Sequence, residues 1–241
     1  MEPGLIDIAS HHDTDKNLSG YLEAYATHFD PIRYRPVKLL ELGIFRGHSL
    51  LLWQEYFPHG LIVGVDINVV SLPGPASRIR MYQGSQADGT LLDQIRRECA
   101  PEGFDVIIDD ASHVGSLASA SFGHLFPHHL KPGGLYAIED WGTGYWDSWS
   151  DGQRYRGPLV DRGVGSDSAA HPSGQAEFHS HPFGMVGFIK ELVDECGIGD
   201  ITHPRFGIPP VRPSSIAQMT VRPGLVLITK AAGTGTSATA R

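Results

Sequence analysis

Residues 37–67, VKLLELGIFRGHSLLLWQEYFPHGLIVGVDI, decide the fold of this chain. The two near-continuous apolar runs, 37–43 and 61–67, are typical of strands that are buried on both faces. The stretch between them, 49–57, has the apolar spacing of an amphipathic helix. A strand, a glycine-containing turn, a helix and a second strand make a βαβ unit, in which the two strands run parallel.

The same alternation continues along the chain. Further strands are predicted at 78–84, 104–110 and 135–140, and further helices at 18–29, 88–99, 114–129 and 183–196. KPGG at 131–134 predicts a turn, and the apolar runs on either side of RPG at 222–224 predict a C-terminal antiparallel hairpin. We therefore expect an α/β fold with a doubly wound, mostly parallel seven-stranded sheet that ends in this hairpin.

The expected organisation is a single domain over residues 1–230. Within it, 1–34 is predicted to be an N-terminal helical segment. Residues 141–182 are rich in glycine, serine, histidine and aromatic side chains and lack periodicity, which is typical of a binding loop or lid. The small polar stretch 231–241 is predicted to be a disordered tail.

Composition excludes several classes of protein. The formal net charge of −8 argues against nucleic acid or an anionic membrane as a partner. There is no apolar run long enough to cross a bilayer and no pattern of a signal peptide, so we expect a cytoplasmic protein. The sequence has 2 cysteines, far apart, which excludes a thiolate zinc site or a disulfide framework.

Polar residues and glycines gather where the first predicted strands end. Gly43 and Gly47 let the backbone approach a ligand, although their spacing is not that of a dinucleotide-binding G-x-G-x-x-G loop, which makes NAD the weaker candidate. A carboxylate at Asp66 suits ribose hydroxyls, and the polar groups after the third strand suit an adenine edge. The predicted cofactor-binding residues are Glu41, Gly43, Gly47, Asp66, Ser85, Gln86 and Asp109. For the glycine loop alone, a purely steric role is an equal alternative.

A second group of residues is suited to binding a metal ion and transferring a proton. Asp110 and the pair Glu139-Asp140 end two strands predicted to be adjacent, so their carboxylates should converge and bind Mg²⁺ or another divalent cation. Without a cation, such clustered charges would be costly unless protons were taken up. His113 follows Asp110 by three residues and is the candidate general base. The alternative for the carboxylates is capping of the next helices.

These motifs, ELGIFRG, VGVDI, QGSQ and the terminal hairpin, resemble those of class I S-adenosylmethionine-dependent methyltransferases. IIDDASH at 107–113 and the later Glu139-Asp140 pair resemble a narrower group, the metal-dependent sugar O-methyltransferases of the mycinamicin and macrocin type. The segment Thr14-Asp15-Lys16 with Tyr21 is also similar to that group. The methyltransferase of mycobacterial methylmannose oligosaccharides is a near neighbour. The resemblance implies a Rossmann-like fold, S-adenosylmethionine as methyl donor, Mg²⁺, and His113 as the base that deprotonates a sugar hydroxyl.

The acceptor is expected to meet the aromatic cluster that follows Asp140. Tyr145, Trp146 and Trp149 offer flat apolar faces suited to a sugar-containing small molecule, although packing of the loop on the sheet explains each of them singly as well. His179 and His181 are weaker candidates for a second metal site. Two other functions stay open: a hydroxylase component similar to the cephalosporin-hydroxylase group, and a non-catalytic nucleotide-binding module. A homo-oligomer is also compatible with the sequence.

Overall fold

The computed structural model describes residues 2–155, 180–205 and 212–232, and its centre is one seven-stranded sheet with the strand order β3-β2-β1-β4-β5-β7-β6. The five strands from β3 to β5 run parallel, and the C-terminal hairpin adds β7 and β6 antiparallel. This confirms the predicted α/β sheet. The strands are β1 (Lys38–Leu42), β2 (Leu61–Asp66), β3 (Ile79–Gln83), β4 (Phe104–Asp109), β5 (Leu130–Glu139), β6 (Ile216–Arg222) and β7 (Leu225–Lys230).

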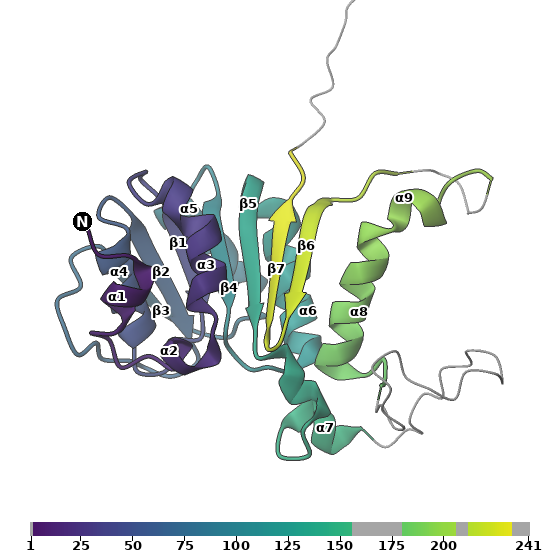
Figure 1. Cartoon of the computed structure of the whole chain (residues 1–241), viewed down its shortest axis with the longest axis horizontal. Coiled ribbons are helices and arrows are strands. Elements are labelled where there is room, and N and C mark those ends of the chain that lie inside the picture. The colour runs from purple at the N-terminus through teal and green to yellow at the C-terminus, as the bar shows by residue number, and fades with distance from the viewer. Residues whose placement is uncertain (1, 156–179, 206–211, 233–241) are drawn as a thin grey trace, which may run out of the picture.

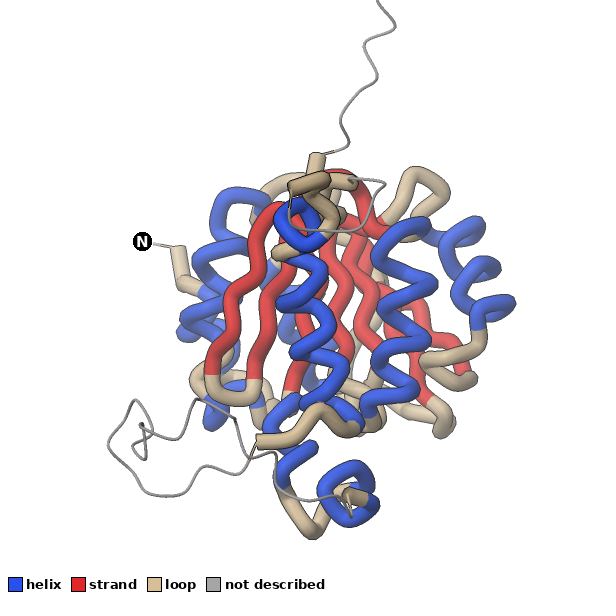
Figure 2. The backbone as a smooth tube through the Cα atoms, turned by 90° about the vertical axis from the view of Figure 1, so that its right-hand side faces the viewer, coloured by secondary structure: helices blue, strands red, loops and turns tan. Residues whose placement is uncertain are grey.

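Helices cover both faces of the sheet (Figures 1 and 2). One core layer lies between the sheet and α1 (Leu5–Ala9), α3 (Leu22–Phe29) and α4 (His48–Tyr56). The other lies under α5 (Gly89–Cys99), α6 (Gly115–His128) and α8 (Gly184–Cys196). Successive strand residues point to opposite faces, so Leu39 belongs to the first layer and Leu40 to the second. The shorter helical segments are α2 (Lys16–Ser19), η1 (Asp30–Ile32), η2 (Trp141–Tyr145), α7 (Ser150–Arg154) and α9 (Ile198–Ile201).

Two local predictions are wrong. The helix predicted at 18–29 is divided into α2 and α3 because Gly20 takes a left-handed conformation (φ 71°) between them. The turn predicted at KPGG lies inside β5 instead. Phe104 pairs with Leu130, but Val106 already pairs with Leu135, so the extra residues of β5 bulge out of the ladder.

The parallel strands end at one edge of the sheet, and this edge carries the site. In Figure 1, β5 points toward α7, and α2 lies at the same end of the sheet. Chain segments from both halves of the protein therefore meet where the strands stop. Within the described residues, no helix is long and apolar enough to cross a membrane. Most of the predicted loop, 156–179, and the tail from 233 onward lie outside the described residues.

Candidate active site

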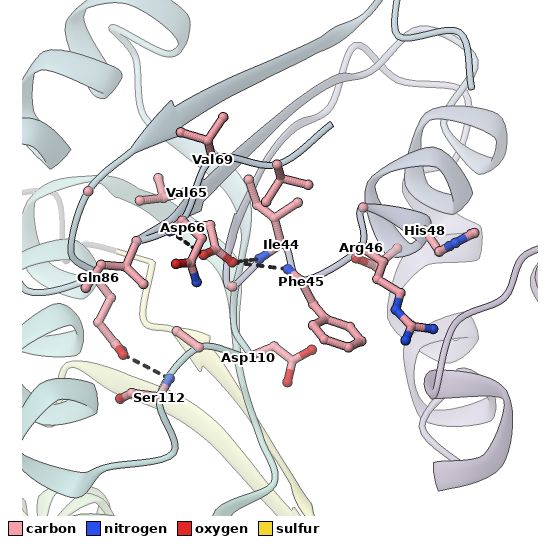
Figure 3. Close-up of a pocket in the computed structure, with 18 of the residues that line it drawn as sticks. Ile44, Phe45, Arg46, His48, Val65, Asp66, Val69, Gln86, Asp110 and Ser112 are labelled. Atoms are coloured by element: carbon pink, nitrogen blue, oxygen red, sulfur yellow. Dashed lines mark hydrogen bonds between the residues drawn. The ribbon is translucent and has the colours of Figure 1, made fainter. Parts of the chain in front are cut away.

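A cavity of about 600 Å³ opens at the carboxyl ends of β1, β2, β3 and β4 (Figure 3). This volume is within the range of pockets that hold small molecules and cofactors. Its wall is made by the loops that follow these strands and by residues 13–15, which precede α2. The location agrees with the rule that open parallel sheets bind ligands beyond the carboxyl ends of their strands.

The glycine loop after β1 is shaped so that only glycine fits. Gly43 has a φ of +91°, and a Cβ atom there would lie 2.1 Å from the backbone oxygen of Asp110. At Gly47, which has a φ of +80°, a Cβ atom would lie 2.2 Å from a methyl carbon of Leu72. Both glycines line the cavity. The loop thus passes close to the end of β4, and Ile44, Phe45 and Arg46 between the two glycines also line the cavity.

Asp66, the last residue of β2, holds this loop. Its Oδ2 accepts hydrogen bonds from the backbone N–H groups of Ile44 (2.8 Å) and Phe45 (3.1 Å), and its Oδ1 accepts one from Asn68 (2.8 Å) (Figure 3). Burial by itself would raise the pKa of Asp66, but these N–H donors outweigh it and lower the pKa below its usual value. The Asn68 side chain also lowers this pKa, so Asp66 is held as a carboxylate at the wall of the cavity.

The polar group after β3 is largely engaged by the protein itself. The amide nitrogen of Gln86 donates to both oxygens of Asp109 (3.0 and 3.1 Å), and its oxygen accepts from the backbone N–H of Ser112 (3.1 Å). Ser85 lines the cavity with a hydroxyl that accepts from Ala87 and keeps its own proton to donate. Gln86 therefore fixes the position of the loop after β4. The Ser85 hydroxyl can donate a hydrogen bond to a ligand in the cavity.

A separate cluster lies where β4 and β5 end. Ligand atoms of Asp110, His113 and Asp140 all lie within 4.8 Å of one another, and the His113 Nε2 is 3.8 Å from the Asp140 Oδ2. Both His113 (φ 52°) and Asp140 (φ 53°) adopt the left-handed backbone region, which non-glycine residues rarely occupy. Such conformations persist where the surrounding structure imposes them, and they concentrate at functional sites.

The remaining acid of this group, Glu139, is bound by a buried cation. The Nζ atom of Lys16 donates to Glu139 Oε2 (2.8 Å) and to Asp110 Oδ2 (2.7 Å), and it lies 3.4 Å from Glu41 Oε1. Only 1% of the Lys16 side chain is exposed. Clustered carboxylates were expected to require a cation, and the chain supplies one of its own from 94 residues before Asp110.

The charges of this cluster shift one another's pKa values. Burial raises the pKa of Glu139 to about 8 and that of Glu41 to about 7, although Lys16 acts in the opposite direction on both. Burial also raises the pKa of Asp110. Burial by itself would lower the pKa of Lys16, but the three surrounding carboxylates outweigh this effect and raise it. The lysine therefore stays charged and holds the carboxylates in place.

Two tyrosines of the same N-terminal segment complete this contact. The Tyr21 hydroxyl donates to Asp140 Oδ1 and the Tyr25 hydroxyl to Glu139 Oε1, each at 2.6 Å. Each of the three predicted metal ligands is thus bound by a side chain from α2, α3 or the two-residue link between them. The sequence suggested this segment only through its resemblance to a family, because no local pattern shows that it packs on the ends of β4 and β5.

Comparison with known proteins finds relatives over almost the whole chain. The mycinamicin VI 2''-O-methyltransferase of Micromonospora griseorubida is 40% identical over 154 residues, which cover 60% of this chain and 38% of that protein. The 8-demethyl-8-alpha-L-rhamnosyl tetracenomycin-C 2'-O-methyltransferase of Streptomyces olivaceus is 31% identical over 243 residues, or 97% of this chain and 56% of its own length. No protein-family model matches.

The fold comparison agrees. The structure of MycE methyltransferase from the mycinamycin biosynthetic pathway, in complex with Mg, SAH and mycinamycin VI, matches with a TM-score of 0.72 and 30% identity. The match covers 96% of this chain and 54% of the MycE chain. The chain belongs to the class I methyltransferases. It spans about half the length of the curated relatives it matches.

In this methyltransferase chain, two of the predicted cofactor-binding residues lie elsewhere. Glu41 and Asp109 are not among the described residues that line the cavity. Glu41 is fully buried on the α4 side, where it accepts from Trp53 Nε1 (3.1 Å). Asp109 is buried on the α6 side, where it accepts from Ser121 Oγ (2.8 Å), and burial raises its pKa to about 6. Strand geometry explains both, because these side chains point to the faces of the sheet and not beyond its edge.

The predicted acceptor residues follow β5 directly. Trp149 packs edge-on against the His113 ring, with centroids 5.2 Å apart, and Trp146 is 55% exposed. Tyr145 packs against His181, which is buried, with ring centroids 5.1 Å apart. His179 lies outside the described residues. Of the three aromatic side chains, Trp149 lies beside the histidine of the site.

Proposed function

We propose that this chain transfers a methyl group from S-adenosylmethionine to a hydroxyl of a sugar-containing small molecule, with the help of Mg²⁺. The supporting observation is the combination of a cofactor-sized cavity with the Asp110–His113–Asp140 cluster, in a chain that is 31–40% identical to sugar O-methyltransferases. The relatives' names specify sugars attached to macrolides and to tetracenomycin, so this acceptor class is the proposed one. The alternatives of a hydroxylase component and a non-catalytic module are not favoured by these relatives.

The cavity fits the methyl donor. Gly43 and Gly47 let the loop pack tightly against Asp110 and Leu72 with positive φ, which keeps the loop in the cavity wall. Asp66 offers a carboxylate at the cavity wall to a ribose hydroxyl, and Ser85 keeps a hydroxyl proton to donate to the adenine. Glu41 and Asp109 lie behind the residues that line the cavity. Asp109 orients Gln86, and Glu41 helps to hold Lys16. When bound, S-adenosylmethionine supplies the methyl group.

The carboxylate cluster fits a hard divalent cation, because its donors are mainly oxygens. We propose Asp110, Glu139 and Asp140 as the ligands. The two oxygens of Glu139 accept from Lys16 and from Tyr25, and each keeps one lone pair for the cation. The Oδ1 atom of Asp110 is the one not bound to Lys16, and it lies toward His113. A cation there would stabilise the negative charge that develops on an acceptor oxygen. Lys16 offsets part of the repulsion between the ligands and so keeps the site assembled.

His113 is proposed to remove the hydroxyl proton of the acceptor. Its Nε2 faces the cluster, 3.8 Å from Asp140 and 4.0 Å from Asp110, beside the proposed cation ligands. Trp149 packs against the ring and limits its rotation. Trp149, Trp146 and Tyr145 are the proposed contacts to the acceptor, which would place its hydroxyl next to His113.

The experiment measures methyl transfer by mass spectrometry. The full chain is incubated with labelled S-adenosylmethionine and either mycinamicin VI or the rhamnosyl tetracenomycin acceptor, with Mg²⁺ or with EDTA. We expect transfer that depends on Mg²⁺ and a rate about 10²–10⁴-fold lower for His113→Gln, with unchanged binding of S-adenosylhomocysteine. Absence of cofactor binding in a calorimetric titration would refute the proposal. Cofactor binding without transfer to either glycoside would favour the non-catalytic module.

Three other expectations stay predictions. These are the single domain over residues 1–230, the cytoplasmic location without nucleic-acid or membrane partners, and self-association. Gel filtration with light scattering tests the last of them directly.

A further inference from the structure

A second group of side chains with the chemistry of metal ligands lies on α5 and at the C-terminal end of α6, outside the residues that line the cavity. Asp93 Oδ1 accepts from the Nε2 atoms of His124 and His129, each at 2.9 Å. The backbone oxygen of His129 accepts from Phe104 N, at the amino end of β4, whereas the cavity lies at its carboxyl end. The six residues of β4 separate the two places by roughly 17 Å along the sheet.

The geometry of this group suits a metal ion of the zinc type. All three ligand atoms lie within 4.8 Å of one another. Zinc binds imidazole nitrogen and carboxylate oxygen at about 2.0–2.1 Å in a tetrahedron, which places neighbouring ligand atoms about 3.3 Å apart. The two contacts of 2.9 Å are slightly shorter than this spacing, so small rotations of the rings would admit an ion.

The surroundings also match. The side chain of His129 is only 3% exposed, and among the described residues its second ring nitrogen, Nδ1, has no hydrogen-bond partner. The Nε2 contact with Asp93 is thus a polar interaction that holds the buried ring. The side chains of Asp93 and His124 are 47% and 31% exposed, so the ion has a path from solvent and room for a bound water. Two nitrogens and one oxygen favour a borderline ion, whereas the carboxylates at the other edge favour Mg²⁺.

We propose that Asp93, His124 and His129 form a structural site for Zn²⁺ or a similar transition-metal ion. The ion would join α5 to the end of α6 and to the connection that leads into β5. It would take no part in methyl transfer, because its ligands lie at the other edge of the sheet. The inference is thus independent of the proposed function.

The test uses the tag-free full chain after dialysis against a chelator. Titration with ZnCl₂ is followed by calorimetry and by the melting temperature, and CoCl₂ serves as an absorbing probe of tetrahedral coordination. We expect a zinc site that Asp110→Asn leaves intact, a higher melting temperature with zinc, and at least about 100-fold weaker binding at that site in His124→Gln, since the loss of even an outer partner of a metal ligand costs about 10- to 100-fold.

Matched variants separate this site from other binding. Asp93→Asn changes a half-exposed side chain and should weaken zinc binding even if His129→Gln does not fold. His59→Gln, on an exposed histidine outside the group, should leave binding unchanged, as should Asp110→Asn at the other edge. Absence of zinc binding, equal binding in Asp93→Asn and His124→Gln, or a loss confined to Asp110→Asn would each overturn the proposal.

Discussion

Lys16→Met removes the buried cation that holds the carboxylate cluster together. The methionine side chain is similar in length and apolar, so the change removes the charge and leaves little empty space. Glu41, Asp110 and Glu139 then keep their burial but lose their positive partner, which lies 2.7–3.4 Å from their oxygens. Buried carboxylates without a counter-charge must either take up protons or destabilise the fold.

The expected loss is large. Breaking a buried ion pair by removing one partner costs about 3–5 kcal/mol in the free energy of unfolding. For a chain of this size, each kcal/mol shifts the melting temperature by about 2–4 °C, so the loss corresponds to roughly 6–20 °C. The matched control is Lys131→Met, which breaks a partly exposed pair with Asp105 (2.9 Å) and should cost about 1 kcal/mol or less.

The dependence on pH gives the sharper readout. The pKa values of Glu139 and Glu41 are already raised to about 8 and about 7, and Lys16 is among the groups that lower them. Without Lys16 both rise further, so between pH 5 and 8 the folded variant binds protons that the unfolded chain has released. Its stability therefore falls as the pH rises.

The assay is thermal unfolding by circular dichroism in EDTA, at pH 5, 6, 7 and 8. The gap between the wild type and Lys16→Met should widen toward pH 8, while the gap for Lys131→Met stays small throughout. A Lys16→Met melting temperature equal to that of the wild type at pH 8, or a gap that does not change with pH, would refute the electrostatic argument.

Three further predictions concern the loops around the site. Gly43→Ala forces a Cβ atom against the backbone of Asp110 and should abolish binding of S-adenosylhomocysteine in calorimetry, whereas Gly123→Ala, with open space around it, should keep full affinity. Asp66→Ala removes the acceptor of three backbone N–H groups and should weaken the same binding by at least tenfold; wild-type affinity would contradict its role. Asp151→Ala leaves the N–H groups of Gly115 and Met185, both at 2.7 Å, without their acceptor; at about 1–3 kcal/mol for each unsatisfied group, urea denaturation should show a loss of about 2–6 kcal/mol, and a loss below about 1 kcal/mol would contradict it.

Much of the site could be predicted because strand ends are visible in the sequence. Apolar runs show where a strand stops, and parallel strands stop at one edge, so Asp66 and Ser85 were expected at the ligand-binding edge and do line one cavity, which Asp110 lines as well. The same reasoning failed for Glu41 and Asp109. Glu41 is the residue before the last of β1, and Asp109 is the last residue of β4. Side chains alternate between the two faces of a sheet, so a shift of one residue in the predicted end of a strand changes whether a side chain points to a face or beyond the edge.

The sequence by itself determined the α/β sheet, its order of strands and helices, and the edge at which polar side chains gather, because these follow from local periodicity and from glycine positions. Only the tertiary structure decided that Lys16 lies among three carboxylates and that Tyr21 and Tyr25 bind two of the predicted metal ligands. These partners are separated along the chain by up to 123 residues, and no local pattern encodes such a contact. The buried charge of Lys16 is stable because the fold brings the carboxylates to it.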